Sequence, residues 1–429
     1  MEPSCSNNVE GKTKAMKKDL SVLHICAGDI SWGAAKGALW LHQSLMECGV
    51  DSHFFIQFGD SDPDQKILSA TSIIGNVSVA LYQKMDRIPV QFYKKRSRSA
   101  LFSPTLLGPS LEKIIAKINP DVIHLHWVNN GLLSMSQISK FKRPVVWTLR
   151  DLWPFTGGCH YSNGCTKYYR VCSACPILGS TSNSDLSSNI FKIKSKIYST
   201  HKNLFPVAIS KWIREEAVKS ALFNQQDIKL IYNGIPCSQF PVWDKLEARK
   251  KLGLPEDKKL ILFGAISSRV DPRKGWEFVE NYFNFHQNED EMLVTFGSDG
   301  FDDDSIPHIS LGKISDTQKL SQIYSACDVF AAPSLEEAFG KTIVESLSCG
   351  TPVVSFDYSA PKELITHCEN GYLAIYKDQA SFDKGIRWCM GESFDKNRRD
   401  KMHLYVEENF NSSNLSTSYK SFYQSVLKN

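Results

Sequence analysis

Short apolar runs recur along the chain, and in the segments between them apolar residues return every three or four positions. The runs are typical of strands buried on both faces, and the longer spacing is typical of amphipathic helices. We expect strands over residues 21–27, 52–57, 121–127, 143–149, 206–210, 229–232, 258–265, 291–297, 328–334 and 352–357. We expect helices over residues 35–48, 110–118, 210–220, 275–287, 317–326, 341–349 and 361–366. This alternation predicts parallel sheets with helices on both faces.

The alternation occurs twice, and a polar connection with several prolines over 236–259 separates the two series. We therefore predict an α/β fold of two doubly wound, Rossmann-like domains, 20–240 and 241–402, that face a central cleft. Ligands of such sheets bind at the carboxyl ends of the strands, so the cleft is the expected site. We expect a disordered tail over 1–19 and a helix over 403–429 that packs back toward the first domain.

Composition and charge exclude several classes of protein. The formal net charge of +4 is too small to indicate nucleic-acid binding. No apolar run approaches the roughly 18 residues that span a bilayer, and the first 20 residues lack the apolar core of a signal peptide. We expect a soluble, cytoplasmic protein. The basic run QFYKKRSR (91–98) suggests contact with an anionic membrane surface at the inner face of the cytoplasmic membrane, with a solvated surface helix as the alternative.

The strongest candidate chemistry lies in SLEEAFGKTIVESLSCGTPVV (334–354), where an expected strand leads into an expected helix. Backbone N–H groups of residues 340–342 at the helix N-terminus favour a phosphate. Glu345, one turn into the helix, can accept two ribose hydroxyls, and Glu337 can reach the hydroxyls of an attached sugar. The alternative is a helix with acidic residues near its first turn, which we prefer for Glu336.

This segment resembles the signature of family 4 glycosyltransferases, which have the two-domain GT-B fold. The signature has a Glu, seven residues and a second Glu, with Phe-Gly shortly after the first. The stretches LGKISDTQKLSQIYSACDVFAAPS and FDYSAPKELITHCENGYLA extend the resemblance over the second half of the chain. It implies that Glu337 contacts the donor sugar and that Glu345 contacts the nucleotide ribose. The expected donor-binding residues of this segment are Phe339, Gly340, Lys341, Thr342 and Glu345.

The charges for a leaving diphosphate are expected in GAISSRVDPRKGWEF, which begins at Gly264. Gly264 permits close approach, and Arg269, Arg273 and Lys274 supply positive charge. The family has an Arg directly after the Gly, whereas this sequence has Ala. Arg269 best replaces that Arg, and Arg273 is a competitor. A solvated basic loop is the alternative for either Arg. Lys274 and the glycine after it match the family, so we expect Lys274 in catalysis with Glu337 and Arg269.

The first half offers a glycine loop for the donor and acceptor. Gly33 in CAGDISWGAAKGALWLHQSL resembles the glycine loop near the amino terminus of family members, which approaches the phosphate and the acceptor. Lys36 and Asp29 are further candidate acceptor contacts.

The acceptor side includes two further strand ends. In VVWTLRDLWPFTGGCHYSNGC, Arg150 occupies the position of a His in many relatives, and Arg cannot act as a base at neutral pH. Asp151 is either a site residue or a partner for Arg150. From DVIHLHWVNNG we expect His126 and Asn129 to face the acceptor, and His124 to be a buried, hydrogen-bonded histidine.

Four cysteines cluster in the loop 157–176: Cys159, Cys165, Cys172 and Cys175. Four thiols in a cytoplasmic loop suggest a tetrahedral structural zinc, and His160 could replace one ligand. Reduced thiols in a packed loop or a disulfide are the alternatives. A subgroup of family members that resembles bacterial polysaccharide-biosynthesis enzymes shares this TGGCHY and cysteine pattern.

The resemblance implies a retaining glycosyltransferase that moves a sugar from a UDP- or GDP-sugar to an acceptor hydroxyl of a glycan or lipid-linked saccharide. No catalytic metal is expected, because positive side chains stabilise the leaving diphosphate and the leaving phosphate can take the acceptor's proton. A GT-B nucleotide-sugar epimerase and a non-catalytic sugar-nucleotide-binding protein are the alternatives. Surface polysaccharide assembly is the expected context.

Overall fold

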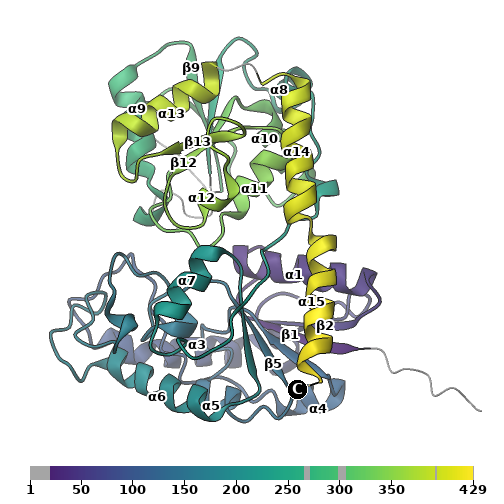
Figure 1. Ribbon diagram of the computed structural model, residues 1–429, viewed down its shortest axis with the longest axis vertical. Helices are drawn as coiled ribbons and strands as arrows, with labels where there is room; N and C mark the ends of the chain where they lie inside the picture. The colour runs from purple at the N-terminus through teal and green to yellow at the C-terminus, as the bar shows by residue number, and fades with distance from the viewer. Residues whose placement is uncertain (1–19, 265–270, 298–305, 392–393, 429) are drawn as a thin grey trace, which may run out of the picture.

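The computed structural model describes residues 20–264, 271–297, 306–391 and 394–428, and it contains two parallel sheets. The first sheet has the order β3-β2-β1-β4-β5-β6-β7, and the second has the order β10-β9-β8-β11-β12-β13. Every strand pair within these sheets is parallel. Figure 1 shows the two halves stacked along the long axis, the first half below and the second above. The predicted α/β fold with two doubly wound sheets is confirmed.

The first half contains the strands β1 (Ser21–Cys26), β2 (Asp51–Ile56), β3 (Ile67–Ser69), β4 (Val122–Leu125), β5 (Val145–Leu149), β6 (Leu204–Ala208) and β7 (Lys229–Leu230). Its helices are α1 (Gly33–Glu47), α2 (Ala70–Ile74), α3 (Asn76–Gln91), α4 (Glu112–Ile118), α5 (Met135–Ile138), α6 (Leu186–Thr200) and α7 (Lys211–Lys219). Strands β1, β4 and β5 are buried at every position, so their near-continuous apolar sequences follow from helices that cover both faces.

The second half contains the strands β8 (Lys259–Gly264), β9 (Glu291–Phe296), β10 (His308–Ser310), β11 (Val329–Ala332), β12 (Val353–Phe356) and β13 (Gly371–Ala374). Its helices are α8 (Lys245–Leu252), α9 (Trp276–His286), α10 (Thr317–Ala326), α11 (Lys341–Ser348), α12 (Pro361–Leu364) and α13 (Gln379–Gly391). The predicted connection over 236–259 therefore contains α8 and the start of β8.

The chain ends in two helices, α14 (Lys396–Phe410) and α15 (Ser412–Val426). Helix α14 packs on α11 of the second half, and α15 packs on α1 of the first half. The pair is visible in yellow along one side of both halves in Figure 1. The expected single helix over 403–429 is thus divided at Asn411, whose side chain accepts a hydrogen bond from the N–H of Ser413 (3.1 Å) and caps the second helix.

Some elements were not predicted from the sequence. The edge strands β3 and β10 are three residues long, too short to show a pattern. Helix α3 carries apolar residues on its solvent side and contains Pro89, so its sequence does not look like that of an ordinary surface helix. The basic run 94–98 follows the end of α3 in turns and bends, so the alternative of a solvated surface helix is wrong for that run.

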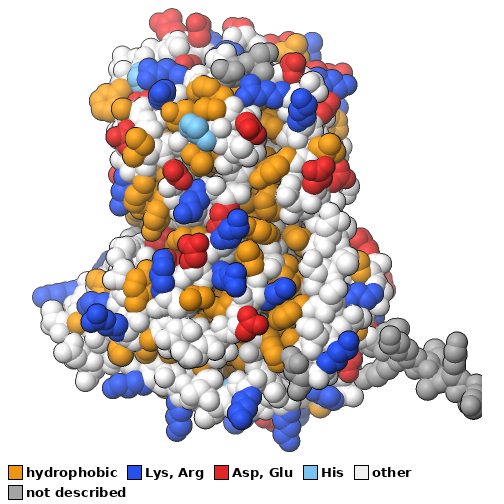
Figure 2. Space-filling model, in the orientation of Figure 1, with side chains coloured by type: hydrophobic (Ala, Val, Ile, Leu, Met, Phe, Trp, Pro, Cys, Tyr) orange, Lys and Arg blue, Asp and Glu red, His pale blue; other side chains and the backbone are white. Residues whose placement is uncertain are grey.

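Within the described residues, no helix is both long and apolar enough to cross a membrane. Charged side chains are unevenly spread over the surface. On the face shown in Figure 2, Lys and Arg side chains project along the lower rim of the first half, while acidic and basic side chains mix where the two halves meet.

Helix α15 is attached to the first sheet by a buried hydrogen bond that can be tested. The Tyr423 hydroxyl and His124 Nδ1 are 2.6 Å apart, and both side chains are fully buried. Burial holds the pKa of His124 well below its usual range, so the ring is neutral. We expect Tyr423→Phe to leave a buried ring nitrogen without a partner and to lower the free energy of unfolding by about 1–3 kcal/mol.

Urea unfolding followed by circular dichroism measures this loss. Tyr82→Phe, at a half-buried position of α3, is the matched control and should change the unfolding midpoint little. Equal midpoints for the two variants would contradict the assigned role of the Tyr423 hydroxyl.

Candidate active site

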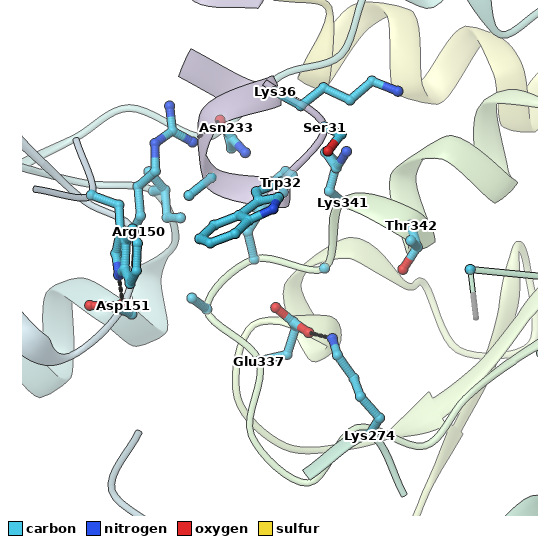
Figure 3. Close-up of a pocket in the computed structure, with 18 of the residues that line it drawn as sticks. Ser31, Trp32, Lys36, Arg150, Asp151, Asn233, Lys274, Glu337, Lys341 and Thr342 are labelled. Carbon is cyan, nitrogen blue, oxygen red and sulfur yellow. Dashed lines mark hydrogen bonds and ion pairs between the residues drawn. The ribbon is translucent and has the colours of Figure 1, made fainter. Parts of the chain in front are cut away.

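A cavity of about 450 Å³ lies between the two halves, at the carboxyl ends of strands from both sheets. Figure 3 shows side chains of the first half, among them Trp32, Lys36 and Arg150, facing Glu337 and Lys341 of the second half. The charged and hydrogen-bonding side chains of the lining are Ser31, Trp32, Lys36, Trp127, Arg150, Asp151, His160, Tyr161, Asn233, Lys274, Glu337, Lys341, Thr342 and Glu345. The cavity is the predicted cleft, and neither half alone encloses it.

Glu345 on α11 presents a carboxylate oxygen without a hydrogen bond. The side chain is buried, and its Oε2 accepts a hydrogen bond from the Tyr324 hydroxyl at 3.0 Å. Its Oε1 lies 3.3 Å from Nζ of Lys341, close enough for ion pairing, but has no hydrogen-bond donor among the described residues. A buried acceptor without a donor costs about 1–3 kcal/mol. A ligand hydroxyl that donates to this oxygen would remove that cost.

The loop before α11 presents backbone N–H groups to the same cavity. Gly340 has a left-handed conformation (φ 95°) and is the residue from which α11 begins. Gly340, Lys341 and Thr342 all line the cavity. The first N–H groups of a helix have no carbonyl acceptor in their own helix, so they are available to an anion.

Glu337 and Lys274 form an ion pair in the cavity, with 2.7 Å between Oε2 and Nζ (Figure 3). Burial alone would raise the pKa of Glu337, but the charges of Lys274 and Arg273 outweigh it and hold the pKa below its usual range. Glu337 is therefore ionised at neutral pH. Its backbone N–H donates to the hydroxyl of Ser359 at 3.1 Å, which fixes the loop after β11.

The position of Lys274 depends on Gly275. Lys274 ends the short 3-10 turn Pro272–Lys274, and Gly275 follows with φ 71°. A Cβ at Gly275 would lie 2.0 Å from the carbonyl oxygen of Pro333, so no other residue fits without movement of the backbone. The loops after β8 and β11 therefore touch at this glycine, and the contact brings Lys274 to Glu337.

Three lysines concentrate positive charge in the cleft. Besides Lys274, Lys341 from α11 and Lys36 from α1 lie on the ring of Trp40, with Nζ at 4.8 and 5.3 Å from its centroid. Burial and the charge of Lys341 lower the pKa of Lys36. A diphosphate would relieve this repulsion, since it carries the opposite charge.

Glu336 joins the two halves. Its buried carboxylate accepts hydrogen bonds from the N–H groups of Ser162 (2.8 Å) and Asn163 (3.0 Å) and from the Ser162 hydroxyl (3.2 Å). The preferred interpretation of Glu336 as an acid near the first turn of a helix is wrong, because α11 begins only at Lys341 and the side chain reaches the cysteine loop of the first half.

A second acid of the upper half caps a helix of the lower half. The Glu363 carboxylate accepts hydrogen bonds from the N–H groups of Lys211 (2.8 Å) and Trp212 (2.7 Å) at the start of α7, and from the hydroxyl of Tyr232 (3.2 Å). The Ser210 hydroxyl donates to the carbonyl of Ala338 at 2.8 Å. These bonds hold Glu363 and the loop before α11, which contains Ala338, against the first half.

Arg150 follows the end of β5 and lines the cavity, and its guanidinium contacts His126 and Asn233. Its Nε lies 3.3 Å from His126 Nδ1, and its Nη1 donates to Asn233 Oδ1 at 3.2 Å. Burial keeps the pKa of His126 well below its usual range, so that His126 is neutral and can accept from the guanidinium. His126 therefore positions Arg150 and does not itself line the cavity.

Asp151 and His160 form a second buried pair at the cavity wall, with 2.6 Å between Oδ2 and Nδ1. The other ring nitrogen of His160 lies 2.8 Å from the Ser103 hydroxyl, and Trp127 donates to Asp151 at 3.1 Å. Both nitrogens of His160 are engaged, so the histidine is not available as a fourth zinc ligand. The sequence motif TGGCHY instead brings this histidine to Asp151, the residue after Arg150.

The four cysteines line one small cavity of about 20 Å³, and no disulfide joins them. Sulfurs around a tetrahedral zinc lie about 3.8 Å apart. No three of these sulfurs lie within 4.8 Å of one another; among the described residues only His24, His124 and His126 meet that limit. Burial raises the pKa of Cys172 to about 12, which favours the protonated thiol. The arrangement does not fit a zinc site, and Cys159 and Cys175 pack as apolar side chains.

The histidine group does not fit a metal either. Both nitrogens of His124 are hydrogen-bonded, to Tyr423 (2.6 Å) and Thr148 (2.7 Å), and the guanidinium of Arg150 lies beside His126. A cation there would meet a fixed positive charge in a buried environment.

Several predicted residues lie outside the cavity lining. Arg273 stacks on the ring of Tyr161 (3.7 Å) and pairs with Asp271 (2.6 Å), so it holds the interface. Gly264 acts indirectly, because a Cβ there would meet the ring of Phe296, which lines the cavity. Asn129 donates to Thr105 at 2.7 Å in its own loop.

Of the other predicted positions, some lie outside the cavity lining and others form part of it. Arg269 lies outside the described residues, and Asp29 lies outside the lining, where it accepts from the Ser31 hydroxyl at 2.6 Å. Gly33 and Lys36 line the cavity, as do Arg150, Asp151 and Phe339.

Several residues of the lining were not predicted from the sequence: Ser31, Trp32, Trp127, His160, Tyr161, Asn233 and Phe296. Asn233 follows a predicted strand directly, and Trp127 and Phe296 lie at the carboxyl ends of predicted strands, where an open sheet presents ligand contacts. Asn233, the first residue after the predicted strand 229–232, was open to that inference. Tyr161 was not, because only the fold of the cysteine loop brings it to the interface.

The contact at Gly275 generates a prediction. We expect Gly275→Ala to lower the free energy of unfolding by several kcal/mol and to weaken nucleotide binding, because the loop that carries Lys274 must move. Gly253→Ala is the matched control: Gly253 has a similar φ of 67°, but a Cβ there meets nothing within 4 Å. That variant should lose only about 1–2 kcal/mol from the left-handed backbone. Thermal unfolding and titration with UDP and GDP measure both effects, and equal losses would contradict the close contact.

Comparisons with known proteins agree with this geometry. The family described as Glycosyltransferase Family 4 matches residues 33–239, and the family described as Glycosyl transferases group 1 matches residues 305–408. The two matches fall on the first and second halves. They cover the glycine loop at one side of the cleft and the two glutamates at the other.

Related proteins are similar over different lengths. A protein of Methanocaldococcus jannaschii named as an uncharacterized glycosyltransferase is 30% identical over 206 residues, which is 44% of this chain and 51% of that protein. The chain thus spans about half the length of this relative. The putative colanic acid biosynthesis glycosyl transferase WcaC of Escherichia coli is 23% identical over 354 residues, 78% of this chain and 82% of the relative.

A solved structure shows the same fold. Anabaena HepE in complex with UDP and glucose superposes with a TM-score of 0.63 at 15% identity, covering 95% of this chain and all of that chain. The sequence matches on both halves and this likeness confirm the predicted family and fold. The chain belongs to glycosyltransferase family 4 and has the two-domain GT-B fold.

Proposed function

We propose that the protein is a retaining glycosyltransferase that moves a sugar from a UDP- or GDP-sugar to an acceptor hydroxyl. The observation that carries the proposal is the buried Oε1 of Glu345, a residue of the cavity lining, which has no hydrogen-bond donor among the described residues. A ribose hydroxyl of a nucleotide supplies that donor. The helix N-terminus at Gly340 and the lysines nearby then meet the diphosphate.

The donor and acceptor classes rest on relatives. HepE is named in complex with UDP and glucose, and WcaC is named for colanic acid biosynthesis. We infer a nucleotide-sugar donor and, as acceptor, a glycan or lipid-linked saccharide of surface polysaccharide biosynthesis. A lipid-linked acceptor would place the protein in the cytoplasm in peripheral contact with the membrane.

Each half contributes different side chains to the proposed reaction. Glu337, ionised and held by Lys274, accepts hydrogen bonds from hydroxyls of the donor sugar. Lys274 and Lys341 stabilise the negative charge that develops on the leaving diphosphate. Arg150 approaches the same region from the first half and adds positive charge where many relatives have a histidine. Since the halves enclose the cavity together, water is excluded from the reacting sugar.

In this mechanism the bond between the anomeric carbon and the diphosphate oxygen breaks while the acceptor oxygen attacks from the same face. The proton of the acceptor hydroxyl passes to the leaving phosphate oxygen. No step requires a catalytic metal, because Lys274, Lys341 and the backbone N–H groups of α11 supply the positive charge.

Donor turnover tests the proposal. We expect slow nucleotide release from one member of a panel of UDP- and GDP-sugars, and a rise of about 10–150-fold in the donor KM on Glu345→Gln, since a hydrogen bond to a charged group contributes about 1.5–3 kcal/mol. Glu369→Gln, an exposed acid of the same half, is the control and should leave KM unchanged. Absence of both binding and release with every donor would overturn the proposal.

The stereochemistry and the reaction class have a separate test. With a saccharide acceptor present, NMR of the product should show the anomeric configuration of the donor. Inversion would refute the retaining mechanism. Conversion of the donor into an epimer without transfer would assign the protein to the nucleotide-sugar epimerases, and binding without any reaction, even with lipid-linked glycans, would indicate a sugar-nucleotide-binding protein.

A further inference from the structure

Helix α3 turns an apolar face toward solvent. Val77, Leu81, Met85 and Ile88 have exposed fractions of 84, 54, 40 and 46%. Their spacing of four, four and three residues places them along one side of the helix. On the opposite side, Val79 and Asp86 are buried. A surface helix of a soluble protein usually presents polar residues outward, so this face is not explained by folding.

The apolar face continues beyond both ends of α3. Ile73 before it is 46% exposed, and Phe92 after it is 79% exposed. The chain then enters the basic run Lys94, Lys95, Arg96 and Arg98, which lies in turns. A row of exposed apolar residues that ends in clustered positive charge is the pattern of a segment that lies in the interface of an anionic bilayer.

A cavity of about 490 Å³ lies at this end of α3. Its charged lining consists of Arg87, Arg96 and Arg98, and its apolar lining includes Val90, Phe102, Ile177 and Leu178. Arg87 donates to Asn130 Oδ1 at 2.9 Å, and Arg96 donates to the carbonyl of Tyr93 at 3.3 Å.

The arginines of this cavity form no ion pair among the described residues. Burial raises the pKa of the neighbouring Asp86, and the charge of Arg87 opposes that rise. Within the described part of the chain, no carboxylate lies within 4.0 Å of the three guanidinium groups. Guanidinium groups bind phosphate oxygens in a bidentate manner, and the apolar wall next to them suits a hydrocarbon chain.

The arginine-lined cavity adjoins the active-site cleft. Leu101 lines both cavities, and its side chain is half exposed. The loop that carries Leu101 also bonds the cysteine loop, through the N–H of His160 and the carbonyl of Leu101 at 3.3 Å. A molecule with its phosphate at the arginines can therefore extend past Leu101 toward Arg150 and the donor sugar.

We propose that the outward face of α3 and the arginine-lined cavity together form a docking surface for a phosphate-bearing lipid in a bilayer. The apolar side chains enter the interface, and the arginines take the phosphate of the lipid whose saccharide reaches the cleft. The commitment to a lipid follows from the combination of an exposed apolar face with arginines that form no ion pair among the described residues. This inference rests on the proposed transferase function and names the class of its acceptor.

Vesicle co-sedimentation of the full chain tests the surface without requiring transfer. The vesicles contain either phosphatidylcholine alone or phosphatidylcholine with phosphatidylglycerol. We expect the protein to bind the second kind, and binding to fall about tenfold or more in Leu81→Glu and in Arg96→Gln with Arg98→Gln. The matched controls are Ile375→Glu, at a 66% exposed position of the second half, and Lys192→Gln with Lys196→Gln on the exposed side of α6. Both controls should bind as the unaltered chain does.

Donor hydrolysis without vesicles separates this proposal from the proposed function. All four variants should release nucleotide at the rate of the unaltered chain, because none of the changed residues lines the cleft. Lost release in every protein, with vesicle binding intact, would overturn the function alone. Intact release with equal vesicle binding by variants and controls, or with no vesicle binding, would overturn the docking surface.

Two further outcomes would reassign the same residues. Binding of inorganic diphosphate in the absence of vesicles that depends on Arg96 and Arg98, with no vesicle binding, would indicate a site for a free phosphate compound. A dimer in light scattering that Leu81→Glu dissociates would assign the face of α3 to a second copy of the chain. Either result would overturn the lipid assignment.

Discussion

The cleft depends on carboxylates of the second half that accept hydrogen bonds from backbone N–H groups of the first half. Glu336 binds the cysteine loop, and Glu363 binds the N-terminus of α7. A carboxylate that leaves water must recover its hydrogen bonds, and each bond to a charged group contributes about 1.5–3 kcal/mol. The backbone N–H groups provide this recovery only when the halves are in contact. Since Glu337 and the loop before α11 lie between these two acids in the sequence, the bonds that join the halves also hold one wall of the cavity in place.

Some charged groups of the cleft are paired with one another, and others lack a partner that a ligand can supply. Lys274 is paired with Glu337, and Lys341 lies within ion-pairing distance of Glu345. Lys36 has no carboxylate within ion-pairing distance among the described residues, and burial and Lys341 lower its pKa. Among the described residues, the cleft thus contains two cations without a carboxylate at ion-pairing distance, Lys36 and Arg150, and one buried carboxylate oxygen that lacks a hydrogen-bond donor. A molecule with an anionic diphosphate and neighbouring hydroxyls satisfies both at once, which is a stricter requirement than charge alone.

The features that could be predicted from the sequence are those that depend on residues close to one another in the chain. The buried strands were visible as apolar runs. Glu337 and Glu345 were predicted from one short motif, and Lys274 was predicted from a second short segment, 264–278. Glu336 was misinterpreted because its partners lie 173 and 174 positions away. The geometry of the cysteine thiols and the burial of Arg273 under Tyr161 were equally beyond local inference, since both result from packing of distant loops. Helix α3 was missed for another reason: its outward residues break the rule from which helices are inferred.

The two segments that connect the halves lie side by side and limit how the halves can move relative to one another. The chain passes from the first half to the second after Ile235 and returns at Asn411, and the two crossings are hydrogen-bonded to each other. The N–H of Ile235 donates to the carbonyl of Phe410 at 3.0 Å, and the N–H of Ser412 donates to the carbonyl of Ile235 at 2.9 Å. Paired crossings at one edge restrict relative motion to a rotation about that edge. Because α15 is bonded to His124 of β4, while His126, the first residue after β4, holds Arg150, the crossing is connected through this buried strand to an arginine of the cleft lining.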